Sequence, residues 1–186
     1  MSERVCPWWL GYMFVSPIRR WLMPRPEKLL APFLREGMTV LEPGPGMGFF
    51  TLIMARMMGT TGRVIAVDIQ PKMLDVLRKR TLRAGLQDRV ETRLAQPDSM
   101  QIDNLNGSVD FVLAFAMVHE VPSAEAFFIE AAAALRTGGA LLLVEPTGHV
   151  TREKFEVELE AARRAGLGLT ERPAVRGNMA ATLRKT

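Results

Sequence analysis

The sequence has few of the residues that cross-link or anchor small proteins. Cys6 is the only cysteine among 186 residues, so no internal disulfide can form and a reducing compartment is expected. The apolar stretch from Val5 to Ile18 is interrupted by Pro7 and Pro17 and is too short to cross a bilayer. We therefore expect a cytoplasmic protein without a signal peptide or a transmembrane segment.

Histidine is also scarce, which restricts metal chemistry. The chain has two histidines, His119 and His149. His119 has no second histidine at helical spacing, so the zinc-protease pattern is absent. The two histidines together with Glu145 would satisfy the ligand count of an open metal site. Because no other metal-ligand pattern supports it, we expect no metal.

The net charge of +4 hides an excess of basic residues in residues 1–93. A basic half can indicate nucleic acid or an anionic membrane surface as partner. However, Arg78, Lys79 and Arg80 fall on a predicted helix without interleaved aromatic side chains that could stack on bases. Nucleic acid is therefore disfavoured as a partner.

Strand and helix patterns alternate along the chain from about residue 38. Short apolar runs bounded by turn residues predict strands that are buried on both faces, and amphipathic stretches between them predict helices. We expect an α/β fold with a mostly parallel sheet of seven strands that ends in an antiparallel hairpin. The predicted strands are residues 38–42, 63–68, 89–95, 109–115, 140–146, 169–175 and 179–184, and the main helices are 49–58, 71–84, 124–136 and 151–165.

A glycine-rich loop follows the first predicted strand, and a helix follows the loop. Its alternating glycines are Gly44, Gly46 and Gly48. Glycines let a backbone turn tightly and approach a ligand, and a helix start offers unpaired N–H groups. A dinucleotide loop would need glycine at position 49, which is Phe49, and Glu42 would repel a pyrophosphate. The loop therefore predicts a nucleotide-like ligand that carries a cationic amino group.

The acid-x-G-x-G-x-G pattern that begins at Glu42 resembles the first motif of the class I S-adenosylmethionine-dependent methyltransferases. The resemblance implies a single doubly wound, Rossmann-like methyltransferase domain over residues 37–186. Residues 1–36 would form an N-terminal aromatic and helical lid segment. The resemblance further implies that Glu42 binds the amino group of S-adenosylmethionine and that the three glycines hold its methionine moiety.

Asp68 lies at the carboxyl end of the second predicted strand. A carboxylate there can accept both ribose hydroxyls because it has two oxygens, and Ile69 would then lie against the adenine ring. The alternative is that Asp68 caps the next helix. By the resemblance, Gln96 would hold the adenine amino group, although the family often has Asp at this position and Asp98 is a rival.

Several candidate residues fall at carboxyl ends of predicted strands, where open α/β sheets bind ligands. They are Glu42, Asp68, Gln96, Phe115 and Glu145. We expect one pocket at this edge, with Phe115 beside the cofactor. The acceptor would be enclosed by Trp8, Trp9, Tyr12, Met117 and Glu145.

Both histidines follow such a strand. Methyl transfer is an in-line displacement, for which the protein supplies alignment and a base if the acceptor must lose a proton. Because histidine titrates near neutrality, His119 and His149 are candidate bases or acceptor-orienting groups. The alternative for each is a polar residue on the rim of the pocket.

The aromatic segment around Trp8, Trp9 and Tyr12 has three interpretations. It is a lid over the acceptor, a helix on the sheet edge, or an interfacial element that contacts anionic lipid. We favour the lid, and with it methyl transfer to a small, partly apolar acceptor. The alternatives are an RNA-modifying methyltransferase and a non-catalytic scaffold that binds the cofactor. The sequence does not indicate the oligomeric state.

Overall fold

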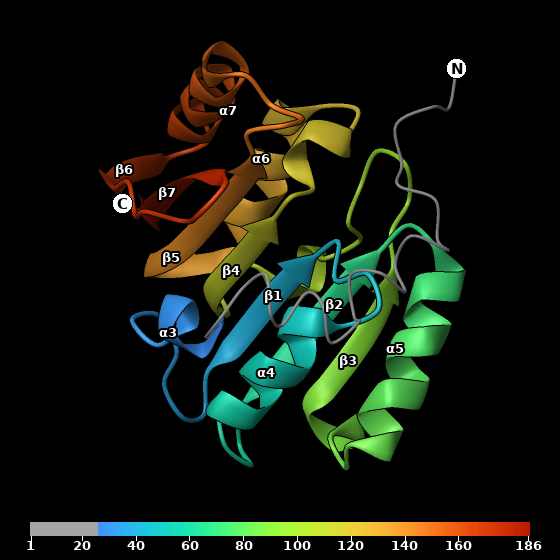
Figure 1. Ribbon diagram of the computed structural model, residues 1–186. Coiled ribbons are helices and arrows are strands. Elements are labelled where there is room, and N and C mark those ends of the chain that lie inside the picture. Colours follow the sequence, from blue (N-terminus) through green and yellow to red (C-terminus); the bar gives the residue numbers. More distant parts are fainter. Residues whose placement is uncertain (1–25) are drawn as a thin grey trace. The chain divides into compact units, whose positions relative to one another are not determined.

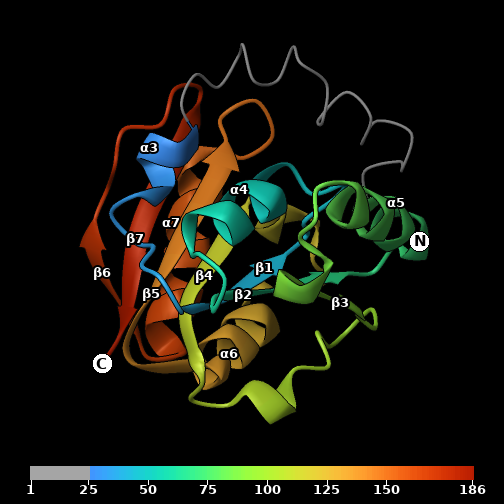
Figure 2. The ribbon, with the colours of Figure 1, turned by 90° about the horizontal axis from the view of Figure 1, so that it is seen from below.

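A computed structural model describes residues 26–186 (Figures 1 and 2). The strands are β1 (Thr39–Pro43), β2 (Arg63–Asp68), β3 (Val90–Leu94), β4 (Val109–Phe115), β5 (Leu135–Pro146), β6 (Leu167–Glu171) and β7 (Asn178–Lys185). The helices are α3 (Pro26–Leu30), α4 (Phe49–Met57), α5 (Pro71–Arg83), α6 (Ala124–Ala134) and α7 (Arg152–Arg164), with short 3-10 helices η2 (Gln87–Arg89), η3 (Asp103–Leu105) and η4 (Val118–Glu120). Over the described part of the chain, no helix has the length and hydrophobicity that a membrane span requires.

The seven strands follow the order β3-β2-β1-β4-β5-β7-β6. The mostly parallel sheet with an antiparallel carboxyl-terminal hairpin is therefore confirmed. The chain forms two compact units, divided between Ala95 and Gln96. Most of the predicted lid segment, including Trp8, Trp9 and Tyr12, lies outside the described residues.

The first unit contains three parallel strands, in which β2 pairs with both β1 and β3. Strand β2 is buried from Val64 to Asp68, as a near-continuous apolar run predicts for a strand covered on both faces. Helix α5 packs against β2 and β3. Its buried stripe is Met73, Leu74 and Leu77. The unit thus holds the ends of β1 and β2 at one edge of the sheet.

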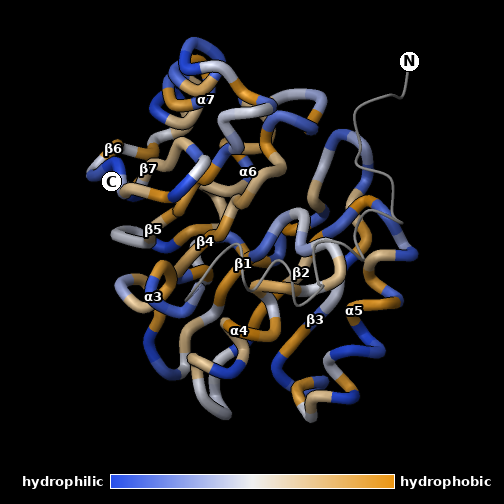
Figure 3. The backbone as a smooth tube through the Cα atoms, viewed as in Figure 1, coloured by the Kyte–Doolittle hydropathy of each residue, from blue (hydrophilic) through white to orange (hydrophobic). Residues whose placement is uncertain are grey.

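The second unit contains β4 parallel to β5, and β7 between β5 and β6 in antiparallel pairing. Helix α7 packs against α6 and β6. Figure 3 shows hydrophilic and hydrophobic residues alternating along α5 and α7, as amphipathic helices require. The largest buried side chains in this unit are Phe111, Phe128 and Phe155.

The boundary between α6 and β5 differs from the prediction. The helix predicted to reach Arg136 ends at Ala134, because Leu135 already belongs to β5 and pairs with Val109. Gly138 has a φ of +75°. This left-handed conformation is accessible to glycine, and it lets the chain bend inside the strand near the point where the β4–β5 register shifts.

The first strand of the final hairpin is also displaced from its predicted position at residues 169–175. It begins at Leu167 and ends at Glu171. Pro173 follows, and proline cannot donate a hydrogen bond to a sheet, so the ladder is interrupted there. An isolated bridge between Val175 and Asn178 then leads into β7.

Candidate functional site

The glycine loop of the first unit adopts backbone angles that explain its sequence. Gly44, Gly46 and Gly48 have φ values of +63°, +55° and +84°. Only glycine adopts such angles readily, so the alternating pattern encodes the path of the loop. The Gly44 N–H donates to the Val67 carbonyl at 2.8 Å, which ties the start of the loop to β2.

Gly46 and Gly48 differ in what surrounds them. A Cβ atom on Gly46 would meet no heavy atom within 4 Å, so this backbone borders open space. A Cβ atom on Gly48 would lie 2.3 Å from Leu77 Cδ1 and 3.0 Å from Leu52 Cδ1. Gly48 therefore permits close packing of α4 and α5, while Gly46 leaves room for a ligand to approach the backbone.

Glu42 is a buried carboxylate at the end of β1. Its side chain is 4% exposed, and its Oε2 accepts a hydrogen bond from Thr51 Oγ1 at 2.5 Å. Thr51 is itself buried on α4. Burying a carboxylate is unfavourable unless donors or a cation compensate its charge. Its position at the end of β1, directly before the glycine loop, places a negative charge where a ligand's cationic group would enter.

Asp68 is buried at the end of β2, with 7% of its surface exposed. Its Oδ1 accepts the Gln70 N–H at 2.9 Å. Gln70 is the N-cap residue of α5, so the helix-capping alternative accounts for this one hydrogen bond. A carboxylate has a second oxygen, and ribose binding is compatible with this contact. The next side chain, Ile69, is 39% exposed and accessible to a ligand ring.

Arg80 is a site residue that the sequence analysis missed. Its Nη1 donates to the carbonyl of Met47 inside the glycine loop. Burial lowers the pKa of Arg80, and the charge of Arg56 adds to this effect. The sequence analysis grouped Arg80 with Arg78 and Lys79 on one predicted helix without assigning it a separate role. Residues two positions apart on a helix point in different directions, and this geometry is the signal that would have separated them.

In the second unit, Glu145 and His119 come together from adjacent strand ends. Glu145 is completely buried, and its Oε1 accepts the Val118 N–H at 2.8 Å. The His119 Nδ1–H donates to Oε2. Residues of η4 thus bind both carboxylate oxygens, and Glu145 contacts the imidazole on its Nδ1 side. The placement of Glu145 in the wall of the acceptor pocket stays a prediction.

The environment of His119 favours its charged form. The hydrogen bond to Glu145 raises the pKa of His119, and this outweighs the opposing effect of burial. Its Nε2 lies 3.9 Å from Glu120 Oε1. The His149 ring is 5.6 Å away between centroids, inclined by 59°, and is exposed. The two histidines therefore lie at one edge of this unit. Within residues 26–186 there is no cluster of His, Cys, Asp or Glu arranged to hold a metal.

Ala116 has an unusual backbone conformation where β4 leads into η4. Its φ is +55°, a left-handed value that non-glycine residues adopt at a cost. Its N–H donates to the Val144 carbonyl at 2.7 Å, which extends the pairing of β4 with β5. The half-buried side chains of Phe115 and Met117 flank this bend. The bend turns the chain into the segment that carries His119.

Gln96 and its rival Asp98 lie in a turn after β3. The Gln96 N–H donates to the Ser99 carbonyl at 2.8 Å, and both candidate side chains are exposed. Both side chains are therefore accessible to a ligand at this end of β3.

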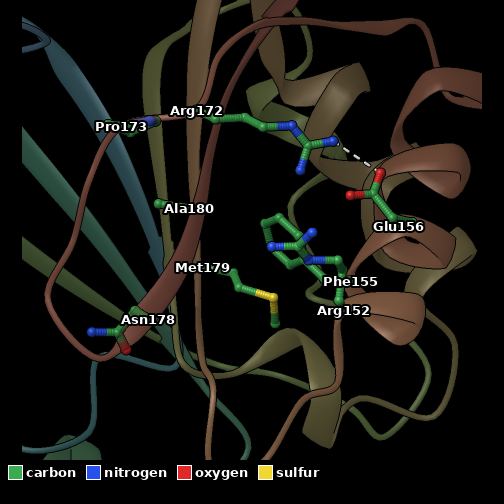
Figure 4. A pocket seen from close by; sticks show the side chains of 8 residues that line it. All are labelled: Arg152, Phe155, Glu156, Arg172, Pro173, Asn178, Met179 and Ala180. Atoms are coloured by element: carbon green, nitrogen blue, oxygen red, sulfur yellow. Dashed lines mark hydrogen bonds and ion pairs between the residues drawn. The ribbon is translucent and has the colours of Figure 1, made fainter.

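A cavity of about 380 Å³ opens between α7 and the β6–β7 connection (Figure 4). Its lining residues are Arg152, Phe155, Glu156, Arg172, Pro173, Asn178, Met179 and Ala180. Arg172 Nη2 donates to Glu156 Oε2 at 2.9 Å across one side. None of the residues predicted for the site lines this cavity. Its walls come from segments that only the tertiary structure brings together, so the sequence contained no signal for it.

Comparisons with known proteins agree with this arrangement. A family model for a methyltransferase domain matches residues 40–139. The crystal structure of an S-adenosylmethionine-dependent methyltransferase from Aquifex aeolicus superposes with a TM-score of 0.86. It is 26% identical and covers 98% of this chain and 100% of the other. The match of the family model over more than half of the chain shows the family.

Two curated relatives differ in their acceptors. Catechol O-methyltransferase from Mycobacterium tuberculosis is 32% identical over 73% of this chain and 61% of its own length. A tRNA (adenine-N1)-methyltransferase from Methanocaldococcus jannaschii is 46% identical over 28% of this chain and 18% of its own length. The chain thus spans about three fifths or less of these relatives. Together with the fold and the family model, these similarities make the chain a member of the class I S-adenosylmethionine-dependent methyltransferases.

Proposed function

We propose that this protein transfers a methyl group from S-adenosylmethionine to a small, partly apolar acceptor. The observation that carries the proposal is a buried carboxylate, Glu42, beside a loop of three left-handed glycines. A site for NAD would place phosphates next to this charge and would be disfavoured. A sulfonium cofactor with a cationic amino group compensates the same charge.

The cofactor would be held along the ends of β1 and β2. Glu42 would bind its amino group, and the backbone from Gly44 to Gly48 would approach its methionine moiety. Asp68 would accept the ribose hydroxyls. Ile69 and Gln96 would contact the adenine ring, and Phe115 would lie beside the cofactor. The open space at Gly46 and the exposed Ile69 support this assignment.

His119 is the favoured base, and His149 would help to orient the acceptor. When bound, S-adenosylmethionine would supply a methyl carbon on a good leaving group, and the electron pair of the broken carbon–sulfur bond would stay on sulfur. His119 would accept the acceptor's proton at Nε2, because its Nδ1 is engaged by Glu145. Met117 would contact the acceptor, and the aromatic segment with Trp8, Trp9 and Tyr12 would cover it.

Calorimetric titration with S-adenosylmethionine, S-adenosylhomocysteine and NAD tests the cofactor assignment. We expect micromolar binding of the first two and no binding of NAD, because Glu42 disfavours a pyrophosphate. Binding of NAD alone would overturn the proposal. Binding of the first two, followed by failure to transfer a labelled methyl group to any of a panel of small phenols, amines and thiols, would favour the scaffold alternative.

Replacing Asp68 with asparagine should weaken the binding of S-adenosylmethionine and S-adenosylhomocysteine by more than about tenfold. Asparagine retains one carbonyl oxygen for the Gln70 N–H, but its amide NH2 replaces the second acceptor with a donor. Hydrogen bonds to charged groups contribute about 1.5–3 kcal/mol each. Calorimetry measures the change, with the exposed Asp88→Asn as the control. Equal affinity in Asp68→Asn and the parent protein would refute the ribose assignment.

RNA is the second candidate acceptor, since the tRNA methyltransferase is 46% identical over 52 residues. This similarity covers 28% of the chain and 18% of the relative, so by itself it is weak support for a shared acceptor. RNA binding whose affinity falls steeply with salt concentration would favour this alternative.

A cytoplasmic location stays a prediction that is supported by the single cysteine. Contact of the N-terminal segment with a membrane surface also stays a prediction, supported by its aromatic residues.

A further inference from the structure

Glu158 is a buried carboxyl group on α7 that no described residue satisfies completely. It is 6% exposed, and its Oε2 has no hydrogen-bond partner in the described part of the chain. Other glutamates of the same helix are paired at the surface, Glu156 with Arg172 and Glu160 with Arg163. An ionised carboxylate without partners is unfavourable in a buried position. Burial without a partner therefore favours the protonated form of Glu158.

Glu158 lies on the buried face of α7 together with Phe155 and Leu159. Phe155, three residues earlier on the same face, lines the cavity together with Met179 (Figure 4). Met179 pairs directly with Glu145 across the β5–β7 ladder, and directly opposed residues point to the same side of a sheet. Glu158 and Glu145 thus belong to one buried layer of this unit.

The charged groups of this layer interact with one another. Burial raises the pKa of Glu158 to about 7, and the negative charge of Glu145 adds to the effect, while His119 and Lys154 oppose it. The hydrogen bond that His119 donates to Glu145 raises the pKa of His119, and the charges of Glu120 and Glu158 contribute in the same direction. Groups that interact in this way titrate as a coupled set rather than independently.

We propose that Glu158 is a positioning residue and that Glu158 and His119, which both interact with the charge of Glu145, hold one proton between them. When Glu158 holds the proton, His119 is neutral and its Nε2 can accept a proton from an acceptor. When Glu158 is ionised, the proton is held on His119. Both forms carry the same total charge, so no counterion has to enter. The base role of His119 rests on the proposed function, whereas the proton sharing does not.

NMR titration of the histidine side chains tests this proposal without any acceptor or cofactor. The chain has two histidines, and His149→Ala identifies the His119 resonance. The resonance is followed between about pH 5 and 9, where histidine titrates, in the parent protein and in Glu158→Gln. We expect a two-step curve for the parent protein. In Glu158→Gln we expect a single step with its midpoint at lower pH, because the second negative charge is gone.

The matched control is Glu160→Gln, which removes an exposed carboxylate two residues away on the same helix. Its His119 curve should superpose on that of the parent protein. Glu158→Met removes the same charge with a different shape, so it should shift His119 in the same direction as Glu158→Gln. Superposition of the Glu158→Gln and parent curves would overturn the proposal, as would opposite shifts in the Gln and Met variants. Loss of cofactor binding in the calorimetric test would leave this outcome unaffected.

Discussion

Replacing Glu42 with glutamine should weaken S-adenosylmethionine binding by at least about 100-fold, because breaking a buried ion pair costs about 3–5 kcal/mol. Glutamine has the same shape and can still accept the hydrogen bond from Thr51, so the pocket should keep its structure. The variant removes only the charge that would face the cofactor's amino group. Calorimetry with the parent protein and Glu42→Gln measures this difference.

A second ligand sharpens the test of Glu42. 5′-Methylthioadenosine has the adenosine and the sulfur but no amino acid moiety, so its affinity should change little in Glu42→Gln. The exposed Glu36→Gln is the control variant, for which both affinities should be preserved. An equal loss for both ligands would mean that the substitution disturbed the pocket as a whole. Unchanged affinity for S-adenosylmethionine would contradict the assignment of Glu42 to the amino group.

Replacing Glu158 with glutamine should increase the free energy of unfolding at pH 8 relative to pH 5 by on the order of 2–3 kcal/mol. Burial raises the pKa of Glu158 from 4.5 to about 7, so the folded protein binds this proton more tightly than the unfolded chain. In the parent protein, proton binding by Glu158 therefore stabilises the fold fully below about pH 4.5, and this stabilisation is lost as the pH rises to about 7. Glutamine does not titrate, and the variant avoids this loss.

Urea denaturation at the two pH values measures this effect. The difference in unfolding free energy between Glu158→Gln and the parent protein should become more favourable to the variant as the pH rises from about 5 to 8. Glu160→Gln, at an exposed position, should show no comparable pH dependence. A Glu158→Gln difference that is the same at both pH values would show that Glu158 titrates normally in the folded protein.

Those parts of the fold that depend on local pattern could be predicted from the sequence. The strands Arg63–Asp68 and Val109–Phe115 were predicted to the residue, because continuous apolar runs between turn residues specify buried strands. The path of the loop after β1 was predictable because alternating glycines mark left-handed positions. The end of α6 was not predictable from the sequence, because Leu135 can continue a helix as well as start a strand. Its pairing with Val109 in the sheet determines that the helix ends before it.

The site was predictable at the level of strand ends but not of contacts. The sequence places His119 and Glu145 at one edge, yet their hydrogen bond depends on the bend at Ala116. Glu158 was overlooked although a signal existed. It lies between Phe155 and Leu159 in the buried stripe of α7, where a helical pattern reserves positions for apolar side chains. A carboxylate in such a stripe indicates a buried titratable group.

The register between β4 and β5 has a consequence for redesign. Phe115 and Val144 are direct partners in adjacent parallel strands, so the ladder fixes the two strand ends, and the bend at Ala116 then brings His119 to Glu145. We expect the turn before β7 to accept segments of other lengths while this pair stays in place, because neither residue lies in that turn. Under the proposed function, the ladder would hold the base in place, and the connection after β5, which carries His149, would be the segment to vary for other acceptors.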